Sequence, residues 1–496
     1  MSEQQSSYRQ IFKATSLFGG VQLINILIGI VRVKLVAVLL GTAGVGIMGL
    51  LNAPLAMITS ISGLGIAFSA VRDVSEASGS GDQRRISEVI KTLRRWSWFT
   101  GLLGAITTIT LAPMLSHWTF GNHEYTWAFV WLSVTLLLQA ISKGQSAILQ
   151  GTRRLKDMAR AGVIGSLLGL FTSLPLYYWY GIRGIVPAMI ITAITGLFLS
   201  WFFSRKVRIE PIQQKWNESF SSGLGMAKLG IFMTLTGFIS SVSGYFLNAF
   251  ISNRGGVDQV GLYNAGWGVV AQYTGLIFTA MATDYFPRLS AINTDIEKVK
   301  AIVRQQAETA LFIITPLLAL LIITMPLVIR LFYTPSFLPV VMFANLTVLG
   351  MPLKVVTWAM GFIYLAKGDG RLFFIVELIY GLFVLSFNLL GYYFWGLEGI
   401  GISFIVTFII GFVINYVIIN LKYGFDYPLS FARTFLLIYL FSIAAFLTSL
   451  IQRLDLKFAS GVVVLILTTT YSLYQLNKVM DLKAALINYI DRLKKK

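Results

Sequence analysis

The sequence lacks the residues on which most enzymes and metal proteins depend. It contains no cysteine, so it has no disulfide, thiolate nucleophile or cysteine-ligated metal. Only 21 of its 496 residues are acidic, and no GxxxxGK[ST] phosphate loop occurs, so we expect no ATP hydrolysis. Its two histidines, His117 and His123, lie near Glu124 in one short loop, which we interpret as solvated and not as a metal site. The predicted outer loops are too short to fold alone, and we therefore predict that the protein is not an enzyme and has no bound cofactor.

Apolar residues make up 56% of the chain, and its mean hydropathy is +0.74. This composition is typical of a polytopic membrane protein. Windows of about 20 residues, the length of a spanning helix, identify fourteen apolar segments without strand-like alternation. We expect an all-α protein with fourteen transmembrane helices, the first of them uncleaved because no signal-peptide pattern precedes it. The segments are approximately 11–40, 45–70, 96–116, 125–148, 161–180, 184–203, 227–251, 259–283, 307–332, 338–366, 372–394, 399–420, 431–451 and 459–476.

The basic residues are distributed unevenly between the two sides of the membrane. If the N-terminus is cytoplasmic, the loops on that side hold 29 of the 40 Lys and Arg residues, and the opposite loops hold four. This asymmetry follows the positive-inside rule and predicts that both termini are cytoplasmic. It accounts for most of the net charge of +19 without a nucleic-acid partner. In the inner loop 71–95 we expect a basic amphipathic helix that begins near Asp82 and lies on the inner membrane surface.

Two halves of the chain repeat one another. Three short stretches match in the same order at nearly one offset, and in the best of them seven of sixteen aligned residues are identical. The matched pairs are Gly29 with Gly244, Gly46 with Gly261, and residues 177–192 with 392–407 at an offset of 215, and Gly151 with Gly368 at an offset of 217. Such a pattern predicts the duplication of a six-helix unit.

The duplication predicts two lobes. Because six is even, both copies enter the membrane from the same side, so we expect the lobes to be related by an axis along the membrane normal, as in transporters built from parallel repeats. We assign residues 1–215 to an N-lobe with helices 1–6 and residues 216–420 to a C-lobe with helices 7–12. Residues 421–496 then form two additional helices and a basic amphipathic tail.

Seven basic residues lie outside the loops counted above. Lys228, Arg330 and Arg433 lie at helix ends, and four lie further inside the apolar segments, namely Arg32, Lys34, Lys143 and Lys354. A charge in a membrane helix costs about 2.5–3.5 kcal/mol on insertion scales, so it usually faces protein or water. If all four face one cavity, they form a ladder of cations along which a diphosphate stays paired, with Arg32 binding it as a fork. Alternatively, Arg32, Lys34 and Lys143 reach the headgroups, and Lys354 forms a structural ion pair with Glu377.

Acids are scarce in the predicted spans. Glu377 is the clearest of them, and it is our candidate site for a coupling proton or ion. Asn248, together with Asn264 and Thr236, is a candidate neutral ligand for sodium. The excess of internal cations favours an anionic cargo, and a duplicated bundle with a groove between its halves favours transport by alternating access.

The turn LLGTAGVGIMGLLNA, residues 39–53, resembles the LG-x-x-G-[FYV]-G signature of Wzx-type O-antigen and polysaccharide flippases. These belong to the multidrug/oligosaccharidyl-lipid/polysaccharide (MOP) exporter superfamily, which also contains MATE exporters and is similarly duplicated. The second copy, VDQVGLYNAGWGVVAQY at residues 257–273, strengthens the resemblance, which covers roughly Ile11 to Asn420.

The resemblance implies a MATE-like fold of two six-helix lobes around a cationic central cavity. It implies a cargo of undecaprenyl-diphosphate-linked oligosaccharide, such as an O-antigen repeat unit in lipopolysaccharide biosynthesis. This cargo would move from the cytoplasmic to the periplasmic leaflet of a bacterial inner membrane, in an antiporter-like cycle coupled to protons or sodium. A glycan polymerase and a chain-length regulator are the implied protein partners.

Two alternatives remain at the level of sequence. Lipid II flippases similarly have two extra C-terminal helices and cations in the first helix, so the cargo could instead be lipid II. The chain could also be a non-transporting membrane scaffold for glycan-assembly enzymes. Drug export is disfavoured, because the acid that multidrug exporters of the superfamily carry in the first or seventh helix is absent here.

Overall fold

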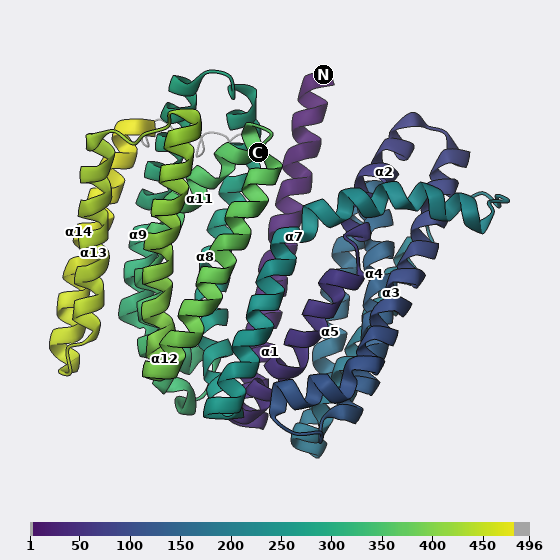
Figure 1. Cartoon of the computed structure of the whole chain (residues 1–496), viewed down its shortest axis with the longest axis horizontal. Coiled ribbons are helices and arrows are strands. Elements are labelled where there is room, and N and C mark those ends of the chain that lie inside the picture. The colour runs from purple at the N-terminus through teal and green to yellow at the C-terminus, as the bar shows by residue number, and fades with distance from the viewer. Residues whose placement is uncertain (1–2, 481–496) are drawn as a thin grey trace. The chain divides into compact units, whose positions relative to one another are not determined.

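The computed structural model describes residues 3–480, with side chains from residue 24 onward except at the last two residues and at some positions of α7 and α8. Regular structure in this part of the chain is entirely helical (Figure 1). The predicted basic tail lies largely outside the described residues. The helices are α1 (Glu3–Ser62), α2 (Ile66–Ser80), α3 (Gln83–Phe120), α4 (Thr126–Gly151), α5 (Leu155–Tyr180), α6 (Ile185–Ser204), α7 (Trp216–Gly255), α8 (Val257–Ala291), α9 (Ile296–Phe332), α10 (Val341–Leu349), α11 (Met351–Ala366), α12 (Gly370–Tyr423), α13 (Leu429–Ser449) and α14 (Leu454–Met480), with short 3-10 turns η1 (Gly181–Gly184) and η2 (Pro335–Val340).

Nine helices of the described chain are long and apolar enough to cross a membrane, or ten if the bent pair Pro335–Leu349 and Met351–Ala366 is one span. Three of the nine are 39, 50 and 54 residues long, about twice the ~20 residues that a crossing needs. If each of these three is two spans, the bent pair and the 35-residue α8 complete the fourteen that the sequence predicts. The three interrupted spans are Ile24–Ser62, broken at Gly41, Leu155–Ser204, broken at Gly181–Gly184, and Gly370–Tyr423, broken at Trp395 and Gly396.

The backbone confirms the predicted duplication. Gly41 and Gly256 both have a positive φ with an extended ψ, at 64° and −165° and at 82° and 173°. Gly181 and Gly396 share another left-handed conformation, at 54° and −131° and at 59° and −142°. Glycine is favoured at all four positions because it has no Cβ to clash at positive φ. The residues of each pair are 215 positions apart, so the same turns recur in both halves.

The predicted offset of 217 at the end of the fourth helix is wrong. Arg153 and Gly368 are the residues with positive φ there, at 55° and 74°. The following amides, of Arg154 and Asp369, each donate to the carbonyl five residues earlier, at 2.8 and 2.9 Å. The offset is therefore 215 here as well. The sequences align Gly151 with Gly368 because glycine is the usual residue at a left-handed helix end. In the first copy, however, Arg153 is the residue with that conformation.

Contacts divide the chain into two compact units. The first contains Met1–Leu262 with Phe332–Ser336, and the second contains Tyr263–Leu331 with Phe337–Lys496. Helix α7 packs on α1, α2 and α3 and so belongs to the first unit, although the repeat places it at the start of the second half. Figure 1 shows the first part of α7 crossing the end of the first unit before the helix turns to run along α1. The lobe boundaries drawn from the sequence stay a prediction.

The two copies of the hairpin turn meet at a pair of glycines. A Cβ on Gly46 would lie 2.0 Å from the carbonyl oxygen of Val257, and a Cβ on Gly261 would lie 2.1 Å from that of Thr42. Val257 and Thr42 are themselves 215 positions apart, so the contact is reciprocal, like an isologous interface. Glycine is needed at both positions because any side chain would separate the two backbones.

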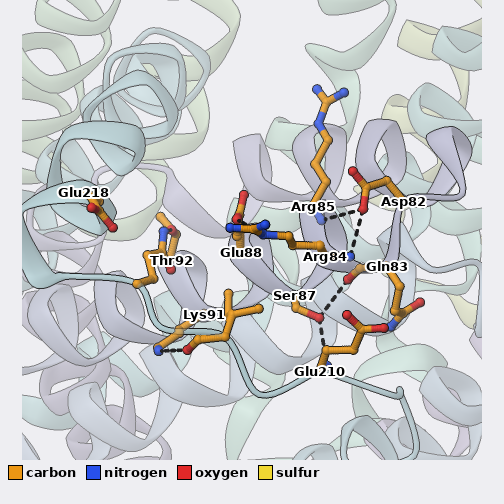
Figure 2. Close-up of polar contacts among 12 residues, drawn as sticks. Asp82, Gln83, Arg84, Arg85, Ser87, Glu88, Lys91, Thr92, Glu210 and Glu218 are labelled. Carbon is orange, nitrogen blue, oxygen red and sulfur yellow. Dashed lines mark hydrogen bonds and ion pairs between the residues drawn. The ribbon is translucent and has the colours of Figure 1, made fainter.

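The start of α3 confirms one prediction and corrects another (Figure 2). Asp82 caps the helix by accepting hydrogen bonds from the amides of Arg84 and Arg85, at 2.9 and 3.2 Å. The predicted start near Asp82 is therefore confirmed. The segment is not a separate surface helix, however, because α3 continues without a break for 38 residues.

The segment that connects α6 to α7 is bound along the first turns of α3 (Figure 2). The Ser87 hydroxyl accepts a hydrogen bond from the Glu210 amide at 2.9 Å, and Lys91 donates to the Ile212 carbonyl at 2.7 Å. Arg95 donates to the Gln214 carbonyl at 3.0 Å. These bonds satisfy the polar backbone of a segment that lacks regular structure, and they fix the start of α7 on the first unit.

Candidate functional site

A cavity of about 660 Å³ lies within the first unit, lined by α1, α2, α3, α4 and α7. Its volume is within the range of about 300–1,000 Å³ that is usual for ligand sites. Roughly half of its lining residues have polar side chains, and none of the lining residues is acidic. The polar lining residues are Asn52, Thr59, Ser60, Ser62, Ser97, Thr100, Gln139, Lys143, Thr234, Thr236 and Ser241.

Lys143 supplies the only charge in the lining of this cavity. It extends from α4, and its side chain is accessible to solvent. Within the described residues it forms no salt bridge, so no carboxylate neutralises it. An ammonium group on a wall of hydroxyls and amides, without a counter-ion, favours binding of an anion.

The hydroxyl groups of the cavity are oriented as acceptors. Thr100, Thr234 and Ser241 donate to carbonyls one turn earlier in their own helices, at 2.8–2.9 Å. Asn52 likewise donates its amide to the Met48 carbonyl at 2.8 Å. Each hydroxyl oxygen and the Asn52 carbonyl keep lone pairs that can accept a hydrogen bond. A ligand with many hydroxyl donors, such as a sugar, matches such a wall.

The second copy of the repeat explains why the first copy is hollow. At the offset of 215, Gly63 and Lys143 of the cavity correspond to Phe278 and Trp358. These two rings pack on each other in the second unit, with centroids 5.3 Å apart. Small and flexible residues in one copy are thus replaced by aromatic rings in the other.

One end of the cavity is closed by a contact between two backbones. Gly65, which lines the cavity, has φ 60°, and a Cβ on it would lie 2.1 Å from the Gly230 carbonyl oxygen of α7. A Cβ on Gly230 would lie 2.4 Å from the Leu64 carbonyl oxygen. The turn before α2 and the α7 backbone therefore touch without intervening side chains.

The two predicted cations of the first helix have different environments. Arg32 is half-buried in α1, and the structure gives it no hydrogen bond or ion pair within the described side chains. Lys34 donates a hydrogen bond to the carbonyl of Tyr333, directly after the end of α9. A cation at a helix C-terminus satisfies an otherwise unpaired carbonyl and complements the helix dipole. Lys34 is thus engaged by protein and does not line the cavity of Lys143.

Lys354 and Glu377 lie in the second unit. The Lys354 ammonium is half-buried in α11, 5.5 Å from the ring centre of Phe278 and 5.9 Å from that of Phe408. Glu377 is half-buried in α12, and these two described side chains form no salt bridge with each other. Lys354 therefore lies near two aromatic rings. The Lys354–Glu377 ion pair, which we gave as an alternative to a place in the cavity, is not formed. Its repeat counterpart, Gln139, does line the cavity of the first unit.

The remaining predicted positions are less distinctive. Asn248 is buried in α7 and donates its amide to the Gly244 carbonyl at 2.7 Å. His117 and His123 stack on each other with centroids 5.3 Å apart, and no group of three metal-ligating residues occurs in the part of the chain that the structure describes. Whether Arg32, Lys34, Lys143 and Lys354 bind substrate stays a prediction.

Sequence reasoning missed most of the residues that build the cavity. Thr59, Ser62, Thr100 and Ser241 carry hydroxyls in long helices, and such residues usually bond their own backbone. A signal was present nonetheless, because Gln139 and Lys143 are polar residues one turn apart in an apolar helix, and both line this cavity.

The duplicated helices have the fold of transporters of the MOP superfamily. A solved structure of the lipid II flippase MurJ, in an inward closed conformation, is similar with a TM-score of 0.66 and 17% identity, covering 93% of this chain and 99% of that one. An inward-facing MATE multidrug transporter of the MOP superfamily has a TM-score of 0.65 and 17% identity, covering 80% and 95%.

The sequence comparisons show the family. A family model described as polysaccharide biosynthesis protein matches residues 35–342, and the chain belongs to this family. A lipid III flippase of Escherichia coli (strain K12) is 22% identical over 367 residues, covering 72% of this chain and 85% of that protein. A putative O-antigen transporter of Shigella flexneri is 23% identical over 302 residues, covering 60% and 71%. The predicted resemblance is therefore confirmed, and the chain is a multi-pass membrane protein of a family to which a flippase and a putative transporter are similar.

Proposed function

We propose that this protein is a flippase for an undecaprenyl-diphosphate-linked oligosaccharide, resembling an O-antigen repeat unit. It moves this cargo from the cytoplasmic to the periplasmic leaflet of a bacterial inner membrane by alternating access. The cavity of the first unit carries the proposal, because its one uncompensated cation and its acceptor-rich wall match a phosphate that is joined to sugars. The flippase and transporter relatives support the same class of cargo.

The cations have separate roles in this proposal. Lys143 binds the diphosphate from the cavity wall, and Lys354 and Arg32 bind it at later positions, so that the charge is never left unpaired in the membrane. The hydroxyls of α1, α3 and α7 bind the sugars. The polyprenyl tail stays in the lipid, because the cost of bringing it into a polar cavity exceeds any gain there.

Coupling to a proton or sodium gradient is assigned to Glu377. This carboxyl group is half-buried in a membrane helix, and ionisable residues there are costly and commonly mark proton or ion pathways. Asn248 is the second candidate, as a neutral ligand for sodium through its amide oxygen. Glu377→Gln is expected to stop export driven by a proton gradient while leaving cargo binding intact.

The decisive experiment replaces Lys143 in the full chain. Lys143→Gln removes the charge and keeps most of the side-chain length, and it is expected to reduce surface glycan at least tenfold, since a hydrogen bond to a charged group contributes about 1.5–3 kcal/mol. Lys143→Arg, which keeps the charge, is expected to retain part of the export. Lys156→Gln, at an exposed lysine outside the cavity, is the matched control and is expected to leave export unchanged.

The measurement is surface glycan in a deletion strain, normalised to the amount of flippase in the membrane. Normal glycan from Lys143→Gln would remove this cavity from the transport path and favour a scaffold role. A lipid II cargo is distinguished by genetics, since a lipid II flippase restores growth to cells depleted of their own. An accessory-glycan flippase restores only the glycan.

A further inference from the structure

A second hollow of about 550 Å³ opens on the surface of the first unit between α3, α4 and α6. It is separate in character from the cavity of Lys143, because its walls are almost entirely apolar. Large apolar side chains at its mouth are exposed, including Trp98 at 51% and Phe198 at 57%. In a membrane span such a surface faces acyl chains. We refer to this hollow as the lipid groove.

Ser97 is the one residue that lines both the lipid groove and the polar cavity, and α3 and α4 pack closely between the two. A Cβ on Gly144 of α4 would lie 2.2 Å from the Ser97 hydroxyl oxygen of α3, and a Cβ on Gly101 would lie 2.9 Å from Leu137. The two helices therefore pack without space for a chain to pass between them, as small residues in membrane helices allow. A lipid whose headgroup is in the polar cavity therefore cannot pass its tail between α3 and α4 into this groove.

One end of the lipid groove is positively charged. Arg94 lines it and supplies its only charge, and the structure gives the Arg94 guanidinium no hydrogen bond or ion pair within the described side chains. Trp201 lines the groove as well, and Arg205, at the end of α6, lies over its ring at 5.0 Å. The buried Gln145 of the groove already accepts a hydrogen bond from Ser200 at 2.6 Å. The charged donors at this end are those of arginine.

We infer that the lipid groove binds an anionic glycerophospholipid, with an acyl chain along the apolar wall and its phosphate on Arg94. The charged end lies in the first half of α3 and near the end of α6, on the side that the distribution of basic residues places at the cytoplasmic leaflet. A guanidinium matches a phosphate through two parallel hydrogen bonds, and tryptophans are favoured at the depth of the headgroups. The bound lipid is an accessory lipid and not the cargo, because α3 and α4 close the way to the polar cavity.

The test uses the purified full chain in detergent and native mass spectrometry, titrated with phosphatidylglycerol or phosphatidylcholine. We expect the chain to retain phosphatidylglycerol in preference to phosphatidylcholine. Arg94→Gln is expected to weaken phosphatidylglycerol binding about fivefold, the effect of one cation on attraction to an anionic headgroup. Arg94→Lys is expected to retain most of the binding. Arg84→Gln is the matched control on the same helix, because Arg84 lies outside the groove and forms an ion pair with Glu88 at 3.3 Å. It is expected to leave phosphatidylglycerol binding unchanged.

A second variant tests the apolar wall independently of charge. Ile194→Trp fills the groove and is expected to abolish retention of phosphatidylglycerol while the thermal unfolding midpoint stays near that of the native chain. Equal binding of phosphatidylglycerol by the native chain and Arg94→Gln would overturn the inference. Displacement of the bound phosphatidylglycerol from the native chain by undecaprenyl phosphate would also overturn it, since the groove would then be a site for the cargo lipid.

Discussion

Replacing Gly46 by alanine is expected to force apart the two hairpin turns that cross there. The new Cβ would lie 2.0 Å from the Val257 carbonyl oxygen, whereas ordinary contacts begin at 3.4 Å. The obstacle is backbone on a helix and cannot rotate away as a side chain would. Overpacking of this kind costs about 1–3 kcal/mol, and the rigid neighbour places Gly46→Ala at the upper end of that range.

The repeat supplies matched partners for this experiment. Gly261→Ala is expected to cost a similar amount, because its Cβ would lie 2.1 Å from the Thr42 oxygen. The double variant is expected to cost less than the sum of the two, because one separation of the helices relieves both clashes. Gly29→Ala and Gly244→Ala are the controls, since a Cβ at either position meets nothing within 4 Å. Alanine there is expected to be neutral or to stabilise its helix by about 0.5–1 kcal/mol.

The measurement is the thermal unfolding midpoint of the purified protein in detergent, followed by the amount that remains monodisperse after heating. Lower midpoints for Gly46→Ala and Gly261→Ala, with native midpoints for both controls, are the expected result. A native midpoint for Gly46→Ala would refute the reasoning, because the two turns then do not approach as described. Additive losses in the double variant would show that the contact is not reciprocal.

Two further predictions concern the turn that follows the fourth and eleventh helices. Arg153→Gly is expected to stabilise the protein by about 0.5–1 kcal/mol and Gly368→Arg to destabilise it by about 1–2 kcal/mol, because both positions have positive φ. The thermal midpoints of the two variants check this prediction. Equal shifts of one sign would contradict it. Hydrogen bonds from Lys422 and then Tyr423 hold the pKa of the Asp369 carboxyl below its usual value. The stability that these bonds confer is full above the ordinary pKa of about 3.9, and it is lost as the pH falls through the lowered pKa. Asp369→Asn is therefore expected to reduce the fall of the thermal midpoint at acid pH. An unchanged acid slope would count against this prediction.

Some features of the fold can be predicted from particular residues of the sequence, and others cannot. Hydropathy predicts the helical class because backbone groups in lipid must be bonded within their own segment, which only helices or closed barrels achieve. The offset of 215 is visible in residues 177–192 and 392–407, because each copy must make the same glycine turn. The equivalence of Arg153 and Gly368 was not visible, because a backbone conformation is shared there by two dissimilar side chains.

The sequence by itself determined the helical membrane class, the duplication and the presence of costly internal cations, because these depend on composition and local pattern. Only the tertiary structure decided which of those cations face a polar cavity. Lys143 lines one with hydroxyls from α1, α3 and α7, whereas Lys34 binds the carbonyl of a residue 299 positions away. The physical reason is that a side chain's partners are set by helix packing across long separations, where no local periodicity records them.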